Sequence, residues 1–312
     1  MNCLVRDVAG PKLCPAGSVV AIGAFDGVHR GHQAVLARVC ERAQASGLTP
    51  VVISFEPLPR EYFGHAKDLP RLTNVREKLE RFAKQGIEKV LLLRFNAALA
   101  TMSAEDFVAR VLVERCAARE VLVGEDFRFG ARRAGDLALL ERMGEQYGFV
   151  ARTIPVFSAA NADGNGQRIS SSSIRSALAN SEFARAAEQL GRMFSMGGHV
   201  VHGAKLGRKL GFPTANIPLR RRVPPVAGIF AVRVLGAAVQ VLPGVASLGT
   251  RPTVAGTERL LEAHLFDFDG DLYGQRIEVE FVAKLRDEEK FADLDALVWQ
   301  MQRDAEQARA IL

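Results

Sequence analysis

Residues 19–32 read Val19-Val20-Ala21-Ile22-Gly23-Ala24-Phe25-Asp26-Gly27-Val28-His29-Arg30-Gly31-His32. The apolar start predicts a buried strand, the glycines predict a turn, and the apolar spacing after His32 predicts a helix. The two histidines lie where this helix begins, and the free N–H groups and positive dipole end found there favour anions. Gly31 lets a ligand approach the backbone closely. The stretch therefore predicts a site for a nucleotide triphosphate.

The composition is that of a globular protein. A length of 312 residues suggests two domains, and 48% hydrophobic with 24% charged residues provides the apolar material for a core. The net charge of +6 suits nucleic acid and phosphorylated small molecules equally. The basic run at residues 220–222 precedes a Pro-Pro turn and is typical of a solvated loop, so no nucleic-acid partner is predicted.

The cysteines and the N-terminal residues bear on the compartment. Cys3, Cys14, Cys40 and Cys116 form no Cys-x-x-Cys pair and have no histidine cluster beside them, which argues against a structural zinc site. Cys40 and Cys116 lie on apolar helical faces and read as small core residues. The sequence has no signal-peptide pattern at its start and no apolar run that could span a bilayer. We therefore expect a reduced, cytoplasmic protein with no membrane partner.

The first half alternates between strand and helix patterns. Such alternation predicts an α/β domain with a doubly wound parallel sheet, whose ligands bind at the carboxyl ends of the strands. Thr73 and Ser103 are the expected helix N-caps, and Gly47, Gly86 and Gly148 lie where helices should end. The expected strands are residues 19–22, 51–55, 90–95, 121–123 and 150–156, and the expected helices are residues 31–46, 74–85, 104–116 and 136–147.

The sequence pattern changes from helical to β-type after a polar loop at residues 163–166 and a predicted helical segment at residues 173–190. Short β-type runs then follow at residues 198–201, 228–235, 239–248, 260–268 and 277–283. Several short strands at this spacing predict a small antiparallel barrel. Residues 291–312 predict a terminal helix with Leu294, Leu297, Val298 and Met301 on one face. We expect two domains, residues 1–184 and 185–312.

Two further segments carry chemistry that is ambiguous when each is taken alone. Ser170 to Ser173, with Arg175 at a helix start, suit a phosphate cradle, but taken alone they favour N-capping serines beside a surface arginine. The histidine stretch matches neither the G-x-G-x-x-G dinucleotide fingerprint nor a Walker A motif. In residues 207–216, Gly-Arg-Lys-Leu-Gly-Phe-Pro-Thr-Ala-Asn, Thr214 and Asn216 suit Mg²⁺, or equally a glycine-rich hairpin.

The histidine pair and the Ser/Arg cluster together resemble the HxGH nucleotidyltransferase superfamily. Residues 124–130, Gly-Glu-Asp-Phe-Arg-Phe-Gly, and Phe55-Glu56-Pro57 look like the FMN adenylyltransferase module of bacterial bifunctional riboflavin kinase/FAD synthetases. The resemblance implies that the FMN phosphate attacks the α-phosphorus of ATP and that pyrophosphate leaves. It implies catalytic roles for His29, His32 and Arg175, and ligand contacts from Gly23, Phe25, Asp26, Gly27, Gly31, Asp126 and Ser171.

The second half resembles riboflavin kinase. The matches are Gly-Phe-Pro-Thr-Ala-Asn at residues 211–216, Leu-Glu-Ala-His at residues 261–264, and Leu285-Arg286-Asp287. Alternation places Glu262 and His264 on one face of a strand. The resemblance implies that Glu262 is the base for the riboflavin 5′-hydroxyl and that Thr214 and Asn216 hold Mg²⁺. It also implies contacts from Gly207 and Gly211, and places Arg286 in a mobile loop near the flavin.

The resemblance implies Mg²⁺ as cofactor and ATP as co-substrate, with riboflavin, FMN and FAD as substrates or products and flavoprotein clients as further partners. The family commonly has a polar residue where this chain has Leu58, and a tyrosine where it has Phe230. Two alternatives remain open from the sequence. One is a riboflavin kinase with impaired adenylyl transfer, because of Leu58. The other is a non-catalytic flavin- or RNA-binding regulator, which the basic charge favours.

Overall fold

The computed structural model describes residues 3–64, 69–154, 168–203, 206–219, 223–253 and 256–312. The chain divides into two compact units, which are described separately. The first unit comprises Met1–Leu69 and Thr73–Ser170, and the second comprises Pro70–Leu72 and Ser171–Leu312. The loop at residues 163–166 and the basic run at residues 220–222 lie outside the described residues. Among the described residues, no helix is both long and apolar enough to cross a bilayer.

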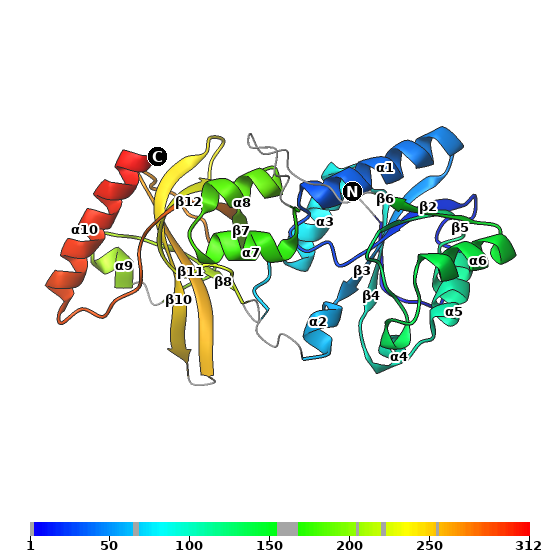
Figure 1. Ribbon diagram of the computed structural model, residues 1–312. Coiled ribbons are helices and arrows are strands. Elements are labelled where there is room, and N and C mark those ends of the chain that lie inside the picture. The colour runs from blue at the N-terminus through cyan, green and yellow to red at the C-terminus, as the bar shows by residue number, and fades with distance from the viewer. Residues whose placement is uncertain (1–2, 65–68, 155–167, 204–205, 220–222, 254–255) are drawn as a thin grey trace. The chain divides into compact units, whose positions relative to one another are not determined.

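The first unit is built on a six-stranded parallel sheet in the order β1-β4-β3-β2-β5-β6 (Figure 1). The doubly wound parallel sheet predicted from the alternating pattern is thus confirmed. The pattern did not predict β1, a three-residue edge strand. The strands are β1 (Cys3–Val5), β2 (Ser18–Ile22), β3 (Thr49–Glu56), β4 (Lys89–Arg94), β5 (Ala118–Gly124) and β6 (Val150–Ile154).

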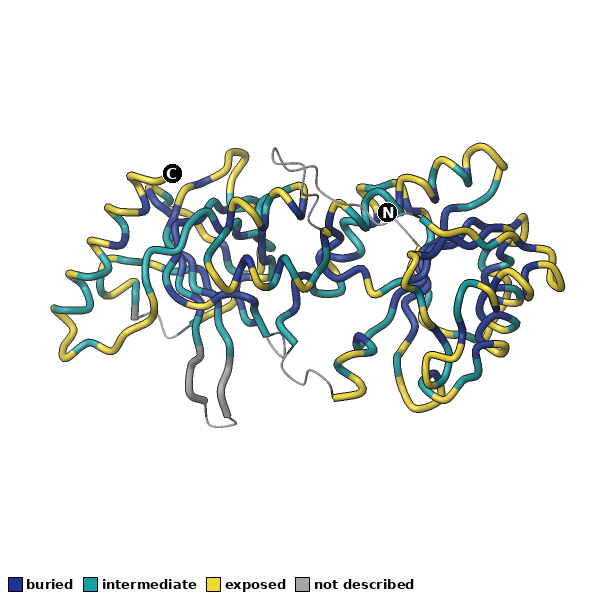
Figure 2. Tube along the Cα trace, viewed as in Figure 1, coloured by how far each residue is buried: buried dark blue, intermediate teal, exposed yellow. Residues whose placement is uncertain are grey.

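The central strands of this sheet are buried along most of their length (Figure 2). Their successive residues belong to core clusters on opposite faces, because side chains alternate along a strand. One face packs Val19, Ala21 and Val52 against helices α1 and α3; the other packs Val20 and Ile22 against η1 and α6. Both faces are therefore covered. The helices of this unit are α1 (Arg30–Ser46), α2 (Pro59–Tyr62), α3 (Val75–Lys84), α4 (Ala97–Ala100), α5 (Ala104–Asp106), η1 (Phe107–Arg115), η2 (Ala131–Arg133) and α6 (Leu137–Tyr147).

Two of the helix predictions for this unit need correction. Asn74, not Thr73, is the N-cap of α3, and it forms a reciprocal capping box with Glu77. The single helix expected over residues 104–116 begins as α5, with Ser103 as its predicted N-cap, and continues as the π-helix η1. Apolar periodicity alone does not separate these two windings, because both bury one continuous face.

Cys116 is fully buried in the core of the first unit, as its apolar setting predicts. Burial raises the pKa of its thiol to about 12, so this side chain remains protonated and unreactive. Cys40 is half-buried, and its Sγ lies 3.3 Å from the Gln85 carbonyl oxygen. Within the described ranges, no group of three or more His, Cys, Asp or Glu side chains is placed to hold a metal ion.

The second unit is an antiparallel six-stranded barrel in the order β7-β12-β9-β10-β11-β8 (Figure 1). A bridge between Val201 and Asn216 joins its two edges and nearly closes it. The predicted barrel is confirmed, although the four-residue strand β8 was too short to give a β pattern. The strands are β7 (Ser195–His199), β8 (Ala215–Pro218), β9 (Gly228–Leu235), β10 (Leu242–Thr253), β11 (Gly256–Leu265) and β12 (Arg276–Arg286).

The helices of the second unit differ from the predicted ones in two ways. The helical piece predicted over residues 173–190 is divided into α7 (Ser171–Ala179) and α8 (Phe183–Leu190), with Ser181 in a left-handed conformation between them. In α10 (Leu294–Ile311), Leu297, Val298 and Met301 of the predicted apolar face are half-buried, but Leu294 is 55% exposed. The fully buried residues of this helix are Asp304 and Ala308. The C-terminal half of α10 packs on β9, because Ala308 joins a cluster with Ala231 and Phe266.

The predicted functional boundary between residues 184 and 185 falls within α8. The division into compact units falls at residues 170 and 171 instead, so α7 and α8 belong to the unit that contains the barrel. The assignment of activities to residues 1–184 and 185–312 stays a prediction, since compactness does not locate chemistry.

Two candidate active sites

The loop at residues 23–29 joins β2 to α1 at the carboxyl edge of the parallel sheet. Three of its residues have positive φ: Phe25 at 49°, Gly27 at 82° and Val28 at 42°. Glycine adopts this region freely, but a β-branched residue such as Val28 does so at a cost of order 1–3 kcal/mol. The surrounding structure must therefore hold this loop in place.

Asp26 and Thr73 fix the middle of the loop. The Thr73 hydroxyl accepts a hydrogen bond from the Gly27 N–H (3.0 Å), and its own N–H and hydroxyl donate to Asp26 Oδ1 (3.0 and 3.1 Å). Asp26 is only 2% exposed. Thr73 therefore does not cap a helix, as was expected, but links the loop to the segment before α3.

The histidine pair lies at the start of α1, as predicted. His29 is the N-cap, and its Nδ1 accepts from the His32 N–H at 3.4 Å. The two rings stack with centroids 3.6 Å apart, and the Phe25 ring lies 5.0 Å from that of His32. Gly31 occupies the first turn of the helix. A Cβ on Gly23 would lie 3.1 Å from the Phe25 ring. Phe25, Gly23 and the histidines are therefore brought together by this loop.

His32 is held in its neutral form. The pKa of His32 lies well below its ordinary 6.5. Burial lowers it most, followed by the neighbouring His29 and then by the Lys78 ammonium. Its Nδ1 atom is buried and has no hydrogen-bond partner among the described residues. A buried ring nitrogen left unsatisfied costs free energy, so this atom is suited to a ligand or a bound water.

This environment predicts a pH dependence of stability. Because the fold lowers the pKa of His32, the unfolded chain binds a proton more readily below pH 6.5 than the folded first unit does. The free energy of unfolding should therefore fall as the pH decreases below about 6.5, by at most ~1.4 kcal/mol per pH unit. Chemical denaturation at pH 7.5 and 5.5 measures this, and His32→Gln should flatten the dependence. An equally steep dependence in that variant would contradict the assignment.

The remaining residues predicted for adenylyl transfer lie in different settings. Asp126 belongs to the first unit; its side chain is 70% exposed and pairs with Arg168 at 2.7 Å. Ser171 begins α7 in the second unit. Arg175 lies in the same helix, where its Nε donates to the Pro70 carbonyl at 2.6 Å. This bond fixes the base of the guanidinium group to the short segment at residues 70–72.

An aromatic group beside the loop was missed from the sequence. Phe55 in β3, Tyr62 at the end of α2, Phe63 after it and Phe95 after β4 have ring centroids 5.3–5.8 Å apart. Tyr62 is 39% exposed and Phe63 53% exposed. Exposed aromatic rings gathered at the carboxyl edge of a sheet suit a flat aromatic ligand. The sequence could have given a signal only if the ends of β3 and β4 were known to be neighbours.

In the second unit, strand register brings the kinase residues into one row. Glu262 of β11 pairs with Asn216 on β8 and with Ser247 on β10. The row continues from Ser247 to Ile229 on β9, and from Ile229 to Arg286 on β12. Directly paired residues share a face of the sheet. The alternate residues of β11, Leu261, Ala263 and Leu265, are buried in the barrel, which confirms the predicted alternation.

Asn216 fits the predicted role of a cation ligand. It is 6% exposed, and its amide nitrogen donates to the Thr214 carbonyl at 3.1 Å. Its Oδ1 is buried and has no partner within the described part of the chain. A Cβ on Gly203 would lie 2.6 Å from this oxygen, so the glycine leaves it room. An amide oxygen is a hard ligand of the kind that Mg²⁺ prefers.

The glycine-rich segment before Thr214 is a short helix and turn rather than a hairpin. Gly207 lies in α9 (Leu206–Lys209), where a Cβ would come within 2.3 Å of the Phe212 carbonyl oxygen. Gly211 has φ +85°. Both positions therefore require glycine. The turn leads to a hollow of about 480 Å³ lined by Val200, Arg208, Pro213, Thr214, Ala215, Leu265, Phe268, Asp269, Gly270, Asp271, Leu272 and Tyr273.

The expectation that Arg286 lies in a mobile loop is wrong. Arg286 is the last residue of β12, and its guanidinium donates to the Asp304 carboxylate of α10 through Nε (2.9 and 3.1 Å) and Nη2 (2.7 Å). Asp304 is 4% exposed and also accepts from Gln300 at 2.8 Å. These bonds raise the pKa of Arg286 and hold its side chain on the face that carries Glu262.

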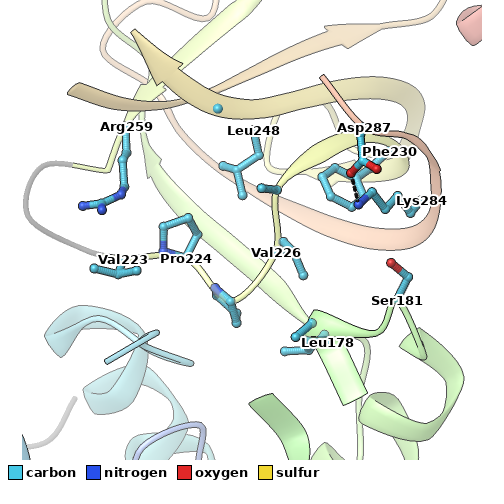
Figure 3. A pocket seen from close by; sticks show the side chains of 14 residues that line it. Leu178, Ser181, Val223, Pro224, Val226, Phe230, Leu248, Arg259, Lys284 and Asp287 are labelled. Atoms are coloured by element: carbon cyan, nitrogen blue, oxygen red, sulfur yellow. Dashed lines mark hydrogen bonds and ion pairs between the residues drawn. The ribbon is translucent and has the colours of Figure 1, made fainter. Parts of the chain in front are cut away.

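Leu58 and Phe230, which depart from the family pattern, are both buried. Leu58 is 3% exposed, and its N–H donates to Glu61 at 2.9 Å. Phe230 is fully buried in the barrel and packs edge-on against Phe281, with centroids 5.1 Å apart. A second hollow, of about 380 Å³, lies beside Phe230 (Figure 3). Its lining includes prolines, Leu248, Arg259 and the Lys284–Asp287 ion pair. None of the predicted site residues is part of this lining.

Comparisons with known proteins identify one family for each half of the chain. The FAD synthetase family model matches residues 12–173, and the riboflavin kinase model matches residues 190–312. A protein of Escherichia coli K12 described as bifunctional riboflavin kinase/FMN adenylyltransferase is 46% identical over 307 residues, covering 98% of this chain and 96% of its own length. A protein of the same description from Pseudomonas fluorescens is 45% identical over 309 residues, covering 99% and 97%.

The likeness extends to a solved structure. A crystal structure described as a macrolide-efflux protein from Streptococcus pneumoniae matches with a TM-score of 0.79 and 29% identity, and covers 99% of this chain and 98% of its own. The matches to the curated relatives run through both halves without interruption, and the two family models account for one half each. The chain therefore belongs to the bifunctional riboflavin kinase/FMN adenylyltransferase family.

Proposed function

We propose that the two activities of the chain are divided between the two sites described above. The chain is an enzyme that phosphorylates riboflavin to FMN and adenylylates FMN to FAD. In our proposal, Glu262 and its row serve the first reaction, and the histidine pair serves the second. The observation that carries the proposal is the buried Oδ1 of Asn216, for which the described residues provide no hydrogen-bond partner. Asn216 lies in direct register with Glu262.

In the kinase reaction, Glu262 takes the proton of the riboflavin 5′-hydroxyl as that oxygen attacks the γ-phosphorus of ATP. A positioned base of this kind contributes roughly 10²- to 10⁴-fold. Thr214 and Asn216 would hold Mg²⁺, which neutralises charge on the phosphate oxygens when bound. The hollow beside Thr214 is the place we assign to the nucleotide, because it is large enough for a small-molecule ligand and opens next to the metal ligands.

Arg286 marks the flavin end of the same site. It lies three strands from Glu262 along the row, which corresponds to about 14 Å at the usual spacing of strands. That distance accommodates an extended riboflavin, with its ribityl hydroxyl at Glu262 and its ring toward Arg286. A planar guanidinium held by Asp304 can stack on a flat ring or donate to its carbonyl oxygens.

In the adenylyl transfer, a phosphate oxygen of FMN attacks the α-phosphorus of ATP, and the bond to pyrophosphate breaks. His29 and His32 would contact the triphosphate at the start of α1, where the helix dipole also favours the charge of the leaving group. Ser171 and Arg175 would hold phosphate oxygens, and the exposed rings of Tyr62 and Phe63 would take the flavin. The work of these residues is orientation and charge stabilisation.

The proposal extends to the setting of the enzyme. We expect it to act in the cytoplasm and to pass FMN and FAD to flavoprotein clients, with no nucleic-acid or membrane partner. The distribution of charge supports small phosphorylated ligands, since acidic and basic side chains pair closely within both units.

The metal assignment predicts a selective effect of Asn216→Ala. The variant should require more Mg²⁺ for half-maximal FMN formation from riboflavin, because one hard ligand is removed. Its conversion of supplied FMN to FAD should keep the Mg²⁺ dependence of the unaltered chain, since Asn216 is assigned to the kinase site. Initial rates at a series of Mg²⁺ concentrations measure both. An unchanged Mg²⁺ requirement for FMN formation would refute Asn216 as a ligand.

A further inference from the structure

Lys78 in α3 is a buried cation next to the histidine pair. Lys78 is only 1% exposed, and its side chain is among the largest that are fully buried. Its Nζ donates to the Ala24 carbonyl oxygen at 2.8 Å. Burying a lysine is costly, because its charge is removed from water, and the hydrogen bond to Ala24 offsets part of this cost. The ammonium group of Lys78 is thus fixed against the loop that leads to the histidines.

The carbonyl that Lys78 binds belongs to the strained loop. Ala24 directly precedes Phe25, the first of the residues with positive φ. Ser54 Oγ donates to the same carbonyl oxygen at 3.2 Å, so two donors converge on it. Thr73 and Asp26 fix the loop further along. Lys78 thus binds the start of the loop that ends at His29. Its donor group is charged, whereas the hydroxyl of Ser54, which binds the same carbonyl oxygen, is neutral.

The charge of Lys78 also reaches the histidines. The groups that bear on His32 are His29 from the loop and Lys78 from α3, while the Phe25 ring that packs against it is neutral. A cation at this place adds positive potential near the start of α1, where a triphosphate would bind. At the same time it disfavours a second positive charge on His32. The imidazole therefore remains able to donate or accept a hydrogen bond without being protonated.

We propose that Lys78 is a positioning residue for adenylyl transfer, which fixes the loop through the Ala24 carbonyl and sets the electrostatic environment of the histidine pair. This role rests on the proposed function of His29 and His32. We assign Lys78 no direct contact with the reacting atoms, because the residue is 1% exposed and its ammonium group donates to the Ala24 carbonyl oxygen. Its effect is transmitted by geometry and by charge, and the two contributions can be separated by substitution.

The test compares three variants in the full-length chain. Lys78→Met removes the charge and the donor, Lys78→Gln removes the charge but keeps an N–H donor, and Ser54→Ala removes a neutral donor to the same carbonyl. For each variant, kcat/KM for ATP is measured with supplied FMN, and the pKa of His32 is measured by NMR titration. FMN formation from riboflavin serves as an internal control. The dispersed resonances of the first unit report that it is folded.

We expect both Lys78 variants to raise the pKa of His32 in part, because burial and His29 still lower it, while Ser54→Ala leaves it unchanged. Lys78→Met should lower kcat/KM for FAD formation by about 10²-fold, as displaced catalytic groups do, with Lys78→Gln intermediate. FMN formation should be unaffected in all three. An unchanged His32 pKa in folded Lys78→Gln, or FAD formation undiminished in both Lys78 variants, would overturn the proposal. Full FAD formation in His29→Ala would instead overturn the function assigned to the histidines.

Discussion

Glu262→Gln is expected to lower kcat for FMN formation by about 10²- to 10⁴-fold, the usual contribution of a positioned general base. Glutamine has nearly the same shape and can remain in register with Asn216 and Ser247, but it cannot take the proton of the riboflavin hydroxyl. The variant should still convert supplied FMN to FAD at the unaltered rate. Chromatographic separation of riboflavin, FMN and FAD after incubation with ATP and Mg²⁺ measures both reactions in one sample.

Glu306→Gln is the matched control for this prediction. Glu306 is an exposed residue of α10 in the same unit, so the substitution removes the same charge without reaching the row of Glu262. We expect both rates to remain within twofold, about the scatter expected of an exposed surface substitution. A Glu262→Gln enzyme that keeps its rate of FMN formation, or that loses FMN and FAD formation together, would contradict the assignment of Glu262 as the base of the kinase site alone.

The sequence predicted those parts of the sites that depend on local pattern. Alternation along residues 261–265 placed Glu262 on the outer face, because a strand has a period of two. The turn before α1 and the position of His29 at its start followed from the glycines and from the apolar spacing. In both cases a few consecutive residues determine the local structure, so a single sequence contains the necessary information.

The parts that were missed depend on contacts between distant segments. The resemblance to riboflavin kinase placed Arg286 in a mobile loop, and nothing near Arg286 in the sequence shows that Asp304, 18 residues later, is buried against it. Thr73 is a residue type that commonly caps helices, but its hydrogen-bond partner is Asp26, 47 residues earlier. The group of Tyr62, Phe63 and Phe95 forms only because β3 and β4 are neighbours in the sheet. Such pairings are set by tertiary structure and leave no periodic signal.

His29→Ala is expected to lower the rate of FAD formation by about 10²- to 10³-fold, as the loss of one preorganised charge-stabilising group typically does. The substitution removes the ring that stacks on His32 and the side chain that caps α1. FMN formation from riboflavin should continue at the unaltered rate, because the kinase row lies entirely in the second unit. FMN should therefore accumulate when the variant is supplied with riboflavin, ATP and Mg²⁺.

Because His29 also caps a helix, the loss of activity must be separated from a loss of stability. Replacing an N-cap by alanine costs about 0.5–2 kcal/mol, whereas asparagine is among the best caps. His29→Asn should therefore restore the stability of the first unit in chemical denaturation but remain as deficient in FAD formation as His29→Ala. Recovery of FAD formation in His29→Asn would show that His29 serves the fold rather than the triphosphate. If His29→Asn loses FAD formation at undiminished stability, the imidazole itself takes part in adenylyl transfer.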